Sequence, residues 1–478
     1  MASGYTEIFR HDTIKVTDFS ASVQKQTCRT GIVGMNYEEA MVYINQLNTK
    51  GIALGLERIT ALLDILGNPQ DALRCVHVAG TNGKGSVCAF LDSALQKAGL
   101  RVGRYISPTL YGYLERFQIN GIWMVEADFA GLLKTVQHAC EQMEAQNLEV
   151  PTVFEVETAI AFLYFKQQNC DYVLLETGMG GRLDSTNVIK KPAVSVITPV
   201  SLDHTAMLGG SLEEIAAEKG GIIKPGCPVV LGPQKAEVLD VLLGCCKKCG
   251  VDPVLCSEAD VQNRQWNLNG QQFTYRGTDL AIRLLGDYQC SNAVIALETL
   301  RVLQKTEPVL TETAMLNGLK NAAWAGRFEM IHANPTVIVD GAHNPAGAQA
   351  LADTLRSHFA DSTIYLLMGV FKDKQYEEIA RIMRVCSDTI YCFAPELERG
   401  LGAKELAEAV RPYYREVFSA DSAEDAVKQV FLRAKENEDR DTIIVSFGSL
   451  STIDAVQNAV MHMDNRYECA ERGAAWTG

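Results

Sequence analysis

Three glycines, a lysine and a serine stand close together near residue 80, in the stretch "VHVAGTNGKGSVCAF" (76–90). They are Gly80, Gly83, Lys84, Gly85 and Ser86. Glycines let the backbone turn sharply and let a ligand approach its N–H groups, while a helix N-terminus and a lysine add positive charge. The turn therefore predicts a site for a di- or triphosphate, with Ser86 near a phosphate-bound magnesium ion. Because Gly85 separates the lysine from the serine, the match to the usual P-loop pattern is imperfect, and a purely structural turn is the alternative.

Further polar side chains directly follow short apolar runs. Ser107 ends "RVGRYIS", Glu176 follows "YVLL", and Asp203 and His204 come shortly after "AVSVITPV". Because the carboxyl ends of parallel strands meet at one edge of a sheet, we expect Ser107, Glu176 and His204 to face the same crevice as the glycine turn. Oxygen and nitrogen ligands of this kind suit a hard cation beside a triphosphate. A helix cap or a surface charge is the alternative for a lone glutamate such as Glu176.

These residues need a parallel sheet to bring them together, and the apolar pattern predicts one. The runs 170–178, 193–200 and 228–232 are apolar without clean alternation, as expected of strands buried on both faces, and helical patterns over 127–143 and 157–168 alternate with the strands. A second series follows, with strands in 336–344, 362–371, 388–395 and 441–449 and a helix over 346–359. The predicted fold class is α/β: a P-loop-containing parallel-sheet N-terminal domain plus a smaller Rossmann-like α/β C-terminal domain.

Length and composition set limits on the kind of protein. The chain has 478 residues and a formal net charge of −14, with 47% hydrophobic and 21% charged residues. Two domains are expected at this length. The negative charge argues against a nucleic-acid partner, no apolar stretch approaches a membrane span, and the N-terminus lacks a secretory signal. We expect a cytoplasmic protein whose fourteen cysteines are reduced; Cys246 and Cys249 form a CxxC that lacks a second pair for zinc.

The order of several motifs resembles one known family. The motifs are "LGLERI", "HVAGTNGKGS", "SPTL" with "ERFQING", "ETGMGGRLDSTN", "LDHTAMLG" with "IAAEKGGIIK", "LLGDYQCSNA", "GRFE" and "VDGAHNP". In this order they resemble the folylpolyglutamate synthase/dihydrofolate synthase family of the Mur ligase superfamily, over nearly the whole chain from Met35. The resemblance implies an ATP-dependent ligase that adds L-glutamate to the γ-carboxylate of a folate through an acyl phosphate. Its small-molecule partners would be ATP as co-substrate, L-glutamate, and folate or dihydropteroate, with one or two Mg²⁺ ions.

The resemblance also implies roles for particular residues. The expected ATP contacts are Gly83, Lys84, Gly85, Ser86, Asn292, Arg327 and Asp340. The expected magnesium ligands are Ser107, Glu176, His204 and Lys219, the last as a carbamate. The expected folate or pteroate contacts are Leu54, Gly55, Leu56, Phe154, Glu155, Arg182, Leu183 and Asp184, and the expected glutamate contacts are His343 and Ser449. Catalysis would rest on Lys84, His204, Lys219, Arg327 and His343.

The reaction needs cations more than a strong base, because three anionic groups meet when a carboxylate attacks the γ-phosphate. Lys84, Arg327 and magnesium would supply them. Arg327 is expected to lie in an interdomain linker, so that it reaches the phosphate when the domains close and exclude water. We expect an N-terminal extension (1–34), an ATP- and folate-binding domain (35–325), this linker (326–335) and a glutamate-ligase domain (336–478).

Two departures from the family pattern and three open questions remain. The family's "EKAGI" is "EKGGI" here, and its "SPHL" or "SPYI" is "SPTL". For Lys219, a solvated helical lysine in a simple salt bridge is the alternative to a carbamate. A cell-wall Mur ligase and a non-catalytic P-loop regulator are the alternative functions. The sequence leaves open whether dihydropteroate is also a substrate, and which folate form and chain length are preferred; a monomer is expected.

Overall fold

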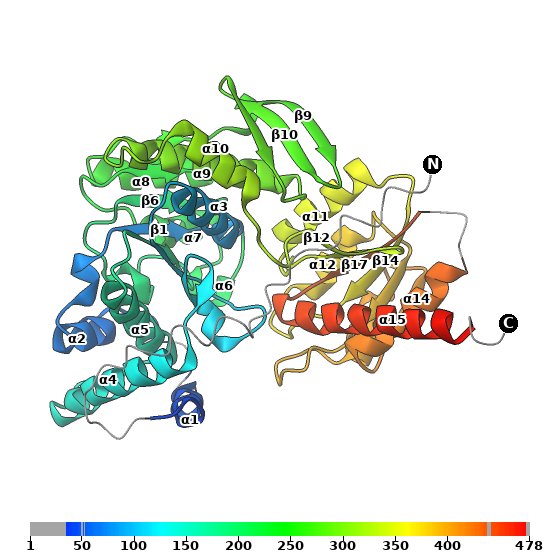
Figure 1. Ribbon diagram of the computed structural model, residues 1–478, viewed down its shortest axis with the longest axis horizontal. Helices are drawn as coiled ribbons and strands as arrows, with labels where there is room; N and C mark the ends of the chain where they lie inside the picture. The colour runs from blue at the N-terminus through cyan, green and yellow to red at the C-terminus, as the bar shows by residue number, and fades with distance from the viewer. Residues whose placement is uncertain (1–34, 49–50, 52, 437–440, 475–478) are drawn as a thin grey trace.

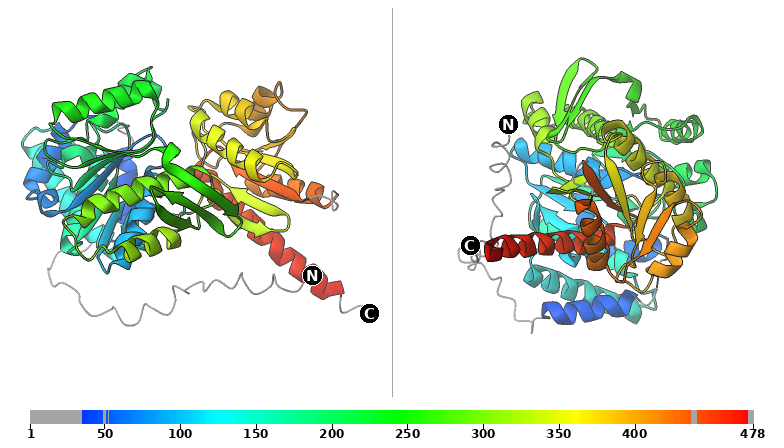
Figure 2. Two further views of the ribbon diagram at one scale, coloured as in Figure 1. Left: turned by 90° about the horizontal axis from the view of Figure 1, so that it is seen from above. Right: turned by 90° about the vertical axis from the view of Figure 1, so that its right-hand side faces the viewer.

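The chain folds into two α/β domains that lie beside each other (Figure 1). The structure is a computed structural model, and it describes residues 35–48, 51, 53–436 and 441–474. The expected N-terminal extension, 1–34, lies outside the described residues. The view from above shows the domains as separate bodies, each with its own sheet and helices (Figure 2, left). The prediction of a parallel-sheet domain followed by a smaller α/β domain is therefore confirmed.

The first domain is built on an eight-stranded sheet in the order β4-β3-β2-β5-β1-β6-β7-β8. Its six parallel strands are β1 (Cys75–Ala79), β2 (Val102–Tyr105), β5 (Tyr172–Glu176), β6 (Val194–Ile197), β7 (Val229–Leu231) and β8 (Val254–Leu255). The two antiparallel strands at one edge are β3 (Phe117–Ile119) and β4 (Ile122–Trp123). The parallel strands are short and buried along their length, which matches the continuous apolar runs in the sequence.

Helices cover both faces of this sheet. On one face lie α3 (Lys84–Lys97), α9 (Tyr288–Gln304) and α10 (Glu312–Asn321), which bury Val76 and Val78 of β1. On the other lie α1 (Tyr37–Asn48), α2 (Glu57–Ile65), α4 (Glu126–Ala145) and α5 (Val153–Gln167), which bury Cys75 of the same strand. Three more helices complete the domain: α6 (Thr205–Leu208), α7 (Leu212–Gly220) and α8 (Ala236–Lys248). Alternate residues of one strand thus enter different cores, as the pleat of a strand requires.

A small antiparallel sheet reaches from the first domain to the second. It contains β9 (Val261–Asn267), β10 (Gly270–Tyr275) and β11 (Thr278–Ile282), and Figure 1 shows it between α9 and α11. Trp266 stacks on His358 of the second domain with ring centroids 4.0 Å apart, and its indole N–H donates to the carbonyl of Leu285 at 2.7 Å. No apolar run in the sequence predicts this sheet, because β9 is exposed along most of its length.

The second domain has a six-stranded sheet in the order β12-β13-β17-β14-β15-β16. Its strands are β12 (Glu329–Ala333), β13 (Thr336–Val339), β14 (Thr363–Met368), β15 (Thr389–Cys392), β16 (Glu416–Ser419) and β17 (Thr442–Phe447), parallel except for β12. The helices α11 (Pro345–His358), α12 (Tyr376–Met383) and α13 (Ala403–Val410) cover one face, and α14 (Ala423–Lys435) and α15 (Ile453–Ala474) cover the other.

Some helices and strands begin at other residues than the sequence predicts. The helix that follows the glycine turn begins at Lys84, so the lysine and the serine lie in its first turn. The helix predicted over 157–168 begins earlier, at Val153, because Thr152 and Glu155 form a capping box at its start. Residues 329–333 of the expected linker form β12, an edge strand of the second sheet, which leaves 322–328 as the segment between α10 and that sheet.

Candidate active site between the two domains

A cavity of about 770 Å³ lies where the carboxyl ends of the first sheet face the second domain. It is lined from both domains and from the segment between them. The expected site residues among its lining are Gly83, Lys84, Gly85, Ser86, Ser107, Glu176, His204, Lys219, Asn292, Arg327, Asp340 and His343. Residues far apart in the sequence thus meet in one place, as a parallel sheet requires of groups at its strand ends.

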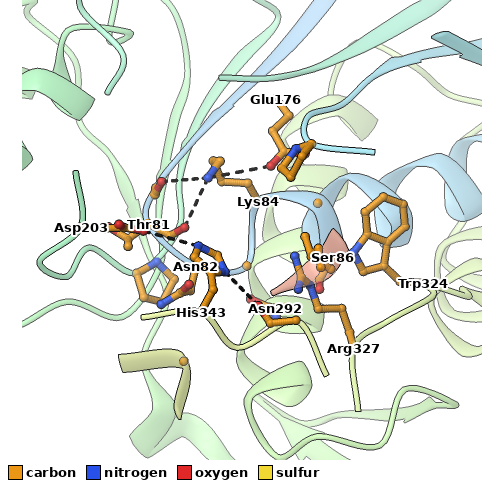
Figure 3. Close-up of a pocket in the computed structure, with 18 of the residues that line it drawn as sticks. Thr81, Asn82, Lys84, Ser86, Glu176, Asp203, Asn292, Trp324, Arg327 and His343 are labelled. Carbon is orange, nitrogen blue, oxygen red and sulfur yellow. Dashed lines mark hydrogen bonds and ion pairs between the residues drawn. The ribbon is translucent and has the colours of Figure 1, made fainter. Parts of the chain in front are cut away.

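The P-loop turn (residues 80–86) connects β1 to α3 and faces the cavity (Figure 3). Gly83 has φ +90°, and a Cβ there would clash with the side-chain amide of Asn292, so only glycine fits. The ammonium of Lys84 donates to the carbonyls of Gly80 at 3.2 Å and Thr81 at 3.3 Å, and it lies 3.8 Å from Oε1 of Glu176. The turn therefore presents the start of a helix and a held cation to the cavity.

Glu176 ends β5 deep in the site, with 7% of its surface exposed. Burial raises the pKa of its carboxyl, and the nearby cations Lys84, Arg327 and Arg104 and a backbone hydrogen bond from Ser107 oppose that rise. The carboxylate thus stands beside Ser107 and among positive charges. Such an oxygen ligand, partly shielded from water, suits a hard cation.

His204 follows β6 in a left-handed conformation (φ +51°) at the start of α6. Burial lowers the pKa of its imidazole, while neighbouring Asp203 opposes the shift. Asp203 itself accepts a hydrogen bond from the side-chain amide of Asn344 at 3.0 Å and lies 3.4 Å from the ammonium of Lys374. Burial alone would raise the pKa of Asp203, but His343 and Lys374 hold it well below its usual range. Asp203 therefore joins the first domain to three side chains of the second.

A second contact across the domain boundary involves the P-loop turn. Asn82 and Asn344 exchange two side-chain hydrogen bonds, at 3.1 and 3.2 Å. Asn344 also caps α11 by accepting from the backbone N–H of Gly347 at 2.8 Å. The N-terminus of α11 is thereby held against the P-loop turn.

Lys219 is buried at the end of α7, with 4% of its surface exposed. Its ammonium donates to the carbonyl of Gly80 at 2.8 Å. Burial, together with the charge of Lys84, lowers the pKa of Lys219 to about 7. A lysine with this pKa is a mixture of charged and neutral amine near neutral pH. The solvated helical lysine considered from the sequence is therefore wrong.

Arg327 reaches the cavity from the segment between the domains. Its guanidinium packs on Gly341, where a Cβ would overlap it. Asp340 fixes the surrounding backbone: its carboxylate accepts from the N–H of Phe328 at 2.8 Å, the hydroxyl of Tyr288 at 2.6 Å and the N–H of Ala342 at 2.8 Å. Burial raises the pKa of Asp340, and the positive charge of Arg327 opposes this rise. The arginine thus lies among acidic groups of both domains.

Comparison with known proteins identifies this arrangement. Residues 78–300 match the Mur ligase middle domain, and residues 326–450 match the Mur ligase glutamate ligase domain. The chain is 34% identical to the dihydrofolate synthase/folylpolyglutamate synthase of Bacillus subtilis over 88% of its own length and 98% of that protein. It is 36% identical to the folylpolyglutamate synthase of Lacticaseibacillus casei over 89% and 99% of the two chains. It belongs to the folylpolyglutamate synthase/dihydrofolate synthase family.

Solved structures of this family have the same fold. The folylpolyglutamate synthase of Mycobacterium tuberculosis, complexed with ADP and AMPPCP, superposes with a TM-score of 0.81 at 30% identity, over 90% of this chain and 99% of that one. A complex of FPGS with AMPPCP and folate superposes with a TM-score of 0.76 at 33% identity, over 89% and 100%. Members of the family are ATP-dependent ligases, and the enzyme class expected from the sequence is confirmed.

The residues expected to contact the folate or pteroate lie outside the lining of the cavity. Two of their segments do meet, because the N–H of Gly55 donates to the carbonyl of Leu183 at 3.4 Å, and Phe154 touches Gly178, which lines the cavity. Oε2 of Glu155 accepts a hydrogen bond from the backbone N–H of Thr152 and lies 3.1 Å from Nε of Arg58. The folate assignments of these family positions remain predictions.

Two more of the expected folate contacts, Asp184 and Arg182, bond to neighbouring groups of the protein, and the two expected glutamate contacts differ in position. Asp184 accepts from the backbone N–H groups of Met179 and Thr186, and Arg182 pairs with Glu218 at 2.8 Å. Ser449 is buried at the end of β17, outside the cavity lining, whereas His343 lines the cavity.

The family's alanine after the lysine is glycine here, and the packing explains why. A Cβ on Gly220 would lie 2.8 Å from the sulfur of Cys245 on α8, so the thiol occupies the space of the missing methyl group.

Sequence reasoning missed several side chains of the site. Arg104, Tyr111, Trp123 and Trp324 all line the cavity but carry no motif that singles them out. Asp203 was noted after its strand, directly before His204, but was given no role in the site. Among the described residues, no three His, Cys, Asp or Glu side chains are grouped so that they could hold a metal ion, and no helix is long and apolar enough to cross a membrane.

Proposed function

We propose that this protein joins L-glutamate to the γ-carboxylate of a folate at the expense of ATP, through an acyl phosphate. The observation that carries the proposal is the single cavity in which the P-loop turn, Glu176, Arg327 and His343 meet from two domains and the segment between them. A site for one nucleotide alone would need only the first domain. A ligase needs the nucleotide, the acid and the amine within reach of one another.

The charges of the cavity suit the first chemical step. The folate carboxylate attacks the γ-phosphorus of ATP, the bond to the β-phosphate oxygen breaks, and ADP leaves. Lys84 and Arg327 are the cations of this chain that would hold the phosphates and the charge that develops on them. The N-terminus of α3, which begins at Lys84, adds its partial positive charge.

The second step needs a positioned amine and no competing water. The glutamate amine attacks the acyl carbon, and the tetrahedral intermediate releases phosphate to leave an amide. We assign His343 to the incoming glutamate because it lines the cavity from the second domain, 3.6 Å from Asp203. The pairs formed by Asp203 and Asn82 with the second domain would keep the cavity closed against water while the acyl phosphate exists.

Magnesium fits the donors of the site only if Lys219 changes. Glu176 and His204 are the carboxylate and imidazole among the four expected ligands, and Ser107 adds a hydroxyl. A protonated lysine would repel a cation, but its neutral amine adds carbon dioxide to give a carbamate and a proton. The buried position and lowered pKa of Lys219 support that modification. Bound there, one or two Mg²⁺ ions would neutralise phosphate charge.

We propose further that the protein acts as a cytoplasmic monomer. The free cysteines among the described residues suit a reducing compartment, and every residue assigned to the reaction comes from one chain. We place the division between the ATP- and folate-binding domain and the glutamate-ligase domain in residues 322–328, between α10 and β12.

Whether dihydropteroate is a second acceptor is decided by the same experiment that tests the main activity. ADP release is measured with ATP, magnesium and L-glutamate, adding tetrahydrofolate, dihydropteroate or no acceptor in turn, and products are analysed by mass. We expect ADP release and a product one glutamate heavier with tetrahydrofolate. ADP release that ignores both glutamate and folate would contradict the proposal, and activity with a cell-wall peptide precursor instead would favour a different Mur ligase.

A further inference from the structure

Trp324 packs directly on the P-loop turn, at the position where that turn becomes α3. A Cβ on Gly85 would lie 2.6 Å from Cζ2 of the indole and 3.2 Å from its Nε1, so the ring rests on the glycine backbone. Figure 3 shows the indole beside Ser86 and Arg327. The absence of a side chain at Gly85 therefore serves the contact with Trp324 as well as the approach of a ligand.

The same indole also stacks against Arg104. The guanidinium carbon of Arg104 lies 5.1 Å from the centroid of the ring, a cation–π contact in a buried setting. The side chain of Arg104 is 10% exposed and is held by Asp92 at 3.3 Å and by the side-chain amide of Gln118 on β3. Its Nε is buried without a hydrogen-bond partner. Arg104 is thus a fixed part of the first sheet, and it holds Trp324 from there.

Trp324 marks the end of the first domain in the connecting segment. The indole packs against the core that contains Val76 and Val87, whereas Phe328, four residues later, is buried in the core of the second domain. Between these two anchors lie Ala325, Gly326 (φ +69°) and Arg327. Gly326 and Phe328 are bonded to the second domain, by the N–H of Gly341 donating to the carbonyl of Gly326 at 2.9 Å and by the N–H of Phe328 donating to Asp340.

Arg327 therefore lies in a short segment between two anchored side chains, Trp324 and Phe328. Because Gly326 and Phe328 fix Arg327 to the second domain, the position of its guanidinium relative to the P-loop turn depends on where the connecting segment leaves the first domain, and that point is Trp324. We propose that Trp324, held by Gly85 and Arg104, is a positioning residue that sets the place of Arg327 over the P-loop turn. The inference rests on the proposed function, in which Arg327 stabilises charge on the transferred phosphoryl group. A displacement of about 1 Å there is enough to lower the rate substantially.

The test is a double-mutant cycle between Trp324→Ala and Arg327→Ala, with initial rates of folate- and glutamate-dependent ADP release. We expect Trp324→Ala to lower kcat about tenfold in the wild-type background and less than twofold in the Arg327→Ala background, with the KM for ATP changed less than threefold. Arg104→Met should give the same pattern with a smaller loss. Arg74→Met removes a matched cation–π contact, with Tyr172 at 4.2 Å, on the far side of the domain and should leave kcat unchanged.

Three results would overturn the inference. One is an equal loss from Trp324→Ala in both backgrounds. Another is a KM for ATP that rises while kcat is kept, because Trp324 would then be a nucleotide contact. The third is a loss of kcat that is accounted for by a lower melting temperature alone. If Trp324→Ala does not fold, Trp324→Phe and Arg104→Met are measured in the same two backgrounds, and their result decides. Failure of the proposed function is distinguishable, since the wild-type enzyme itself would then show no folate-dependent ADP release.

Discussion

Lys219 gives the sharpest quantitative expectation, because its environment changes how much neutral amine it offers to carbon dioxide. With a pKa of about 7, roughly half of the Lys219 side chains are neutral at pH 7. An ordinary lysine, with a pKa of about 10.4, would be neutral in only about one molecule in 2,500 at that pH. Burial and the charge of Lys84 therefore raise the reactive form on the order of a thousandfold, and the neutral form is lost as the pH falls through 7.

The perturbation is removal of dissolved carbon dioxide, followed by its return at a fixed concentration and fixed magnesium. We expect activity to decay in carbon-dioxide-free buffer as the carbamate hydrolyses, and to recover when the gas returns. The rate of recovery should follow the neutral fraction, which rises about tenfold from pH 6 to pH 8 for a pKa near 7. For an unperturbed lysine the same rise would be about a hundredfold. Recovery is read from ADP release after each incubation time.

Substitution supplies the second arm of this experiment. Lys219→Ala should lose nearly all activity and regain part of it with acetate or propionate, which can place a carboxylate in the gap. Butylammonium restores a positive charge instead and should not help. Lys224→Ala is the matched control, because burial also lowers the pKa of that lysine but it lies outside the cavity lining. Full activity without carbon dioxide, a hundredfold pH effect, or rescue by the amine would refute the reasoning.

Three further expectations concern other groups. Lys84→Ala should lower kcat/KM on the order of a thousandfold, because the ammonium beside Glu176 stabilises charge that grows during phosphoryl transfer; near-normal steady-state turnover would show that the turn is structural. Arg327→Ala should lower kcat on the order of a hundredfold with little change in the affinity for ATP measured by calorimetry, and the opposite split would contradict its role. His77, whose Nε2 lies 2.7 Å from the hydroxyl of Thr186, has a pKa lowered by burial to about 3. In the unfolded chain this imidazole binds a proton below pH about 6.5, so the folded protein should lose stability as the pH falls from about 6.5 to about 3, on the order of 3 kcal/mol by pH 4. In urea unfolding, His77→Gln should not show this loss of stability in acid. An unchanged pH profile in the variant would argue against the expectation.

Much of the first domain can be predicted from the sequence because its signals are local. Apolar runs such as 170–178 specify buried parallel strands, and the glycines near Lys84 specify a turn that other residues cannot form. Glu176 and His204 then follow from the rule that functional side chains gather at the carboxyl ends of parallel strands. Capping was not predicted from the sequence: the carboxylate of Glu155, whose folate contact remains a prediction, forms a capping box with Thr152 and pairs with Arg58.

The sequence by itself determined the fold class, the P-loop turn and the strand-end groups, because each depends on residues that are neighbours along the chain. The tertiary structure alone decided what those groups meet. Asp203 faces Asn344 and Lys374 of the other domain, and Trp324 rests on Gly85 and Arg104. Such contacts join residues up to about 240 positions apart, and their distances depend on how two whole domains pack, which no local pattern encodes. The lowered pKa of Lys219 has the same origin, since burial is a property of the assembled core and not of "EKGG".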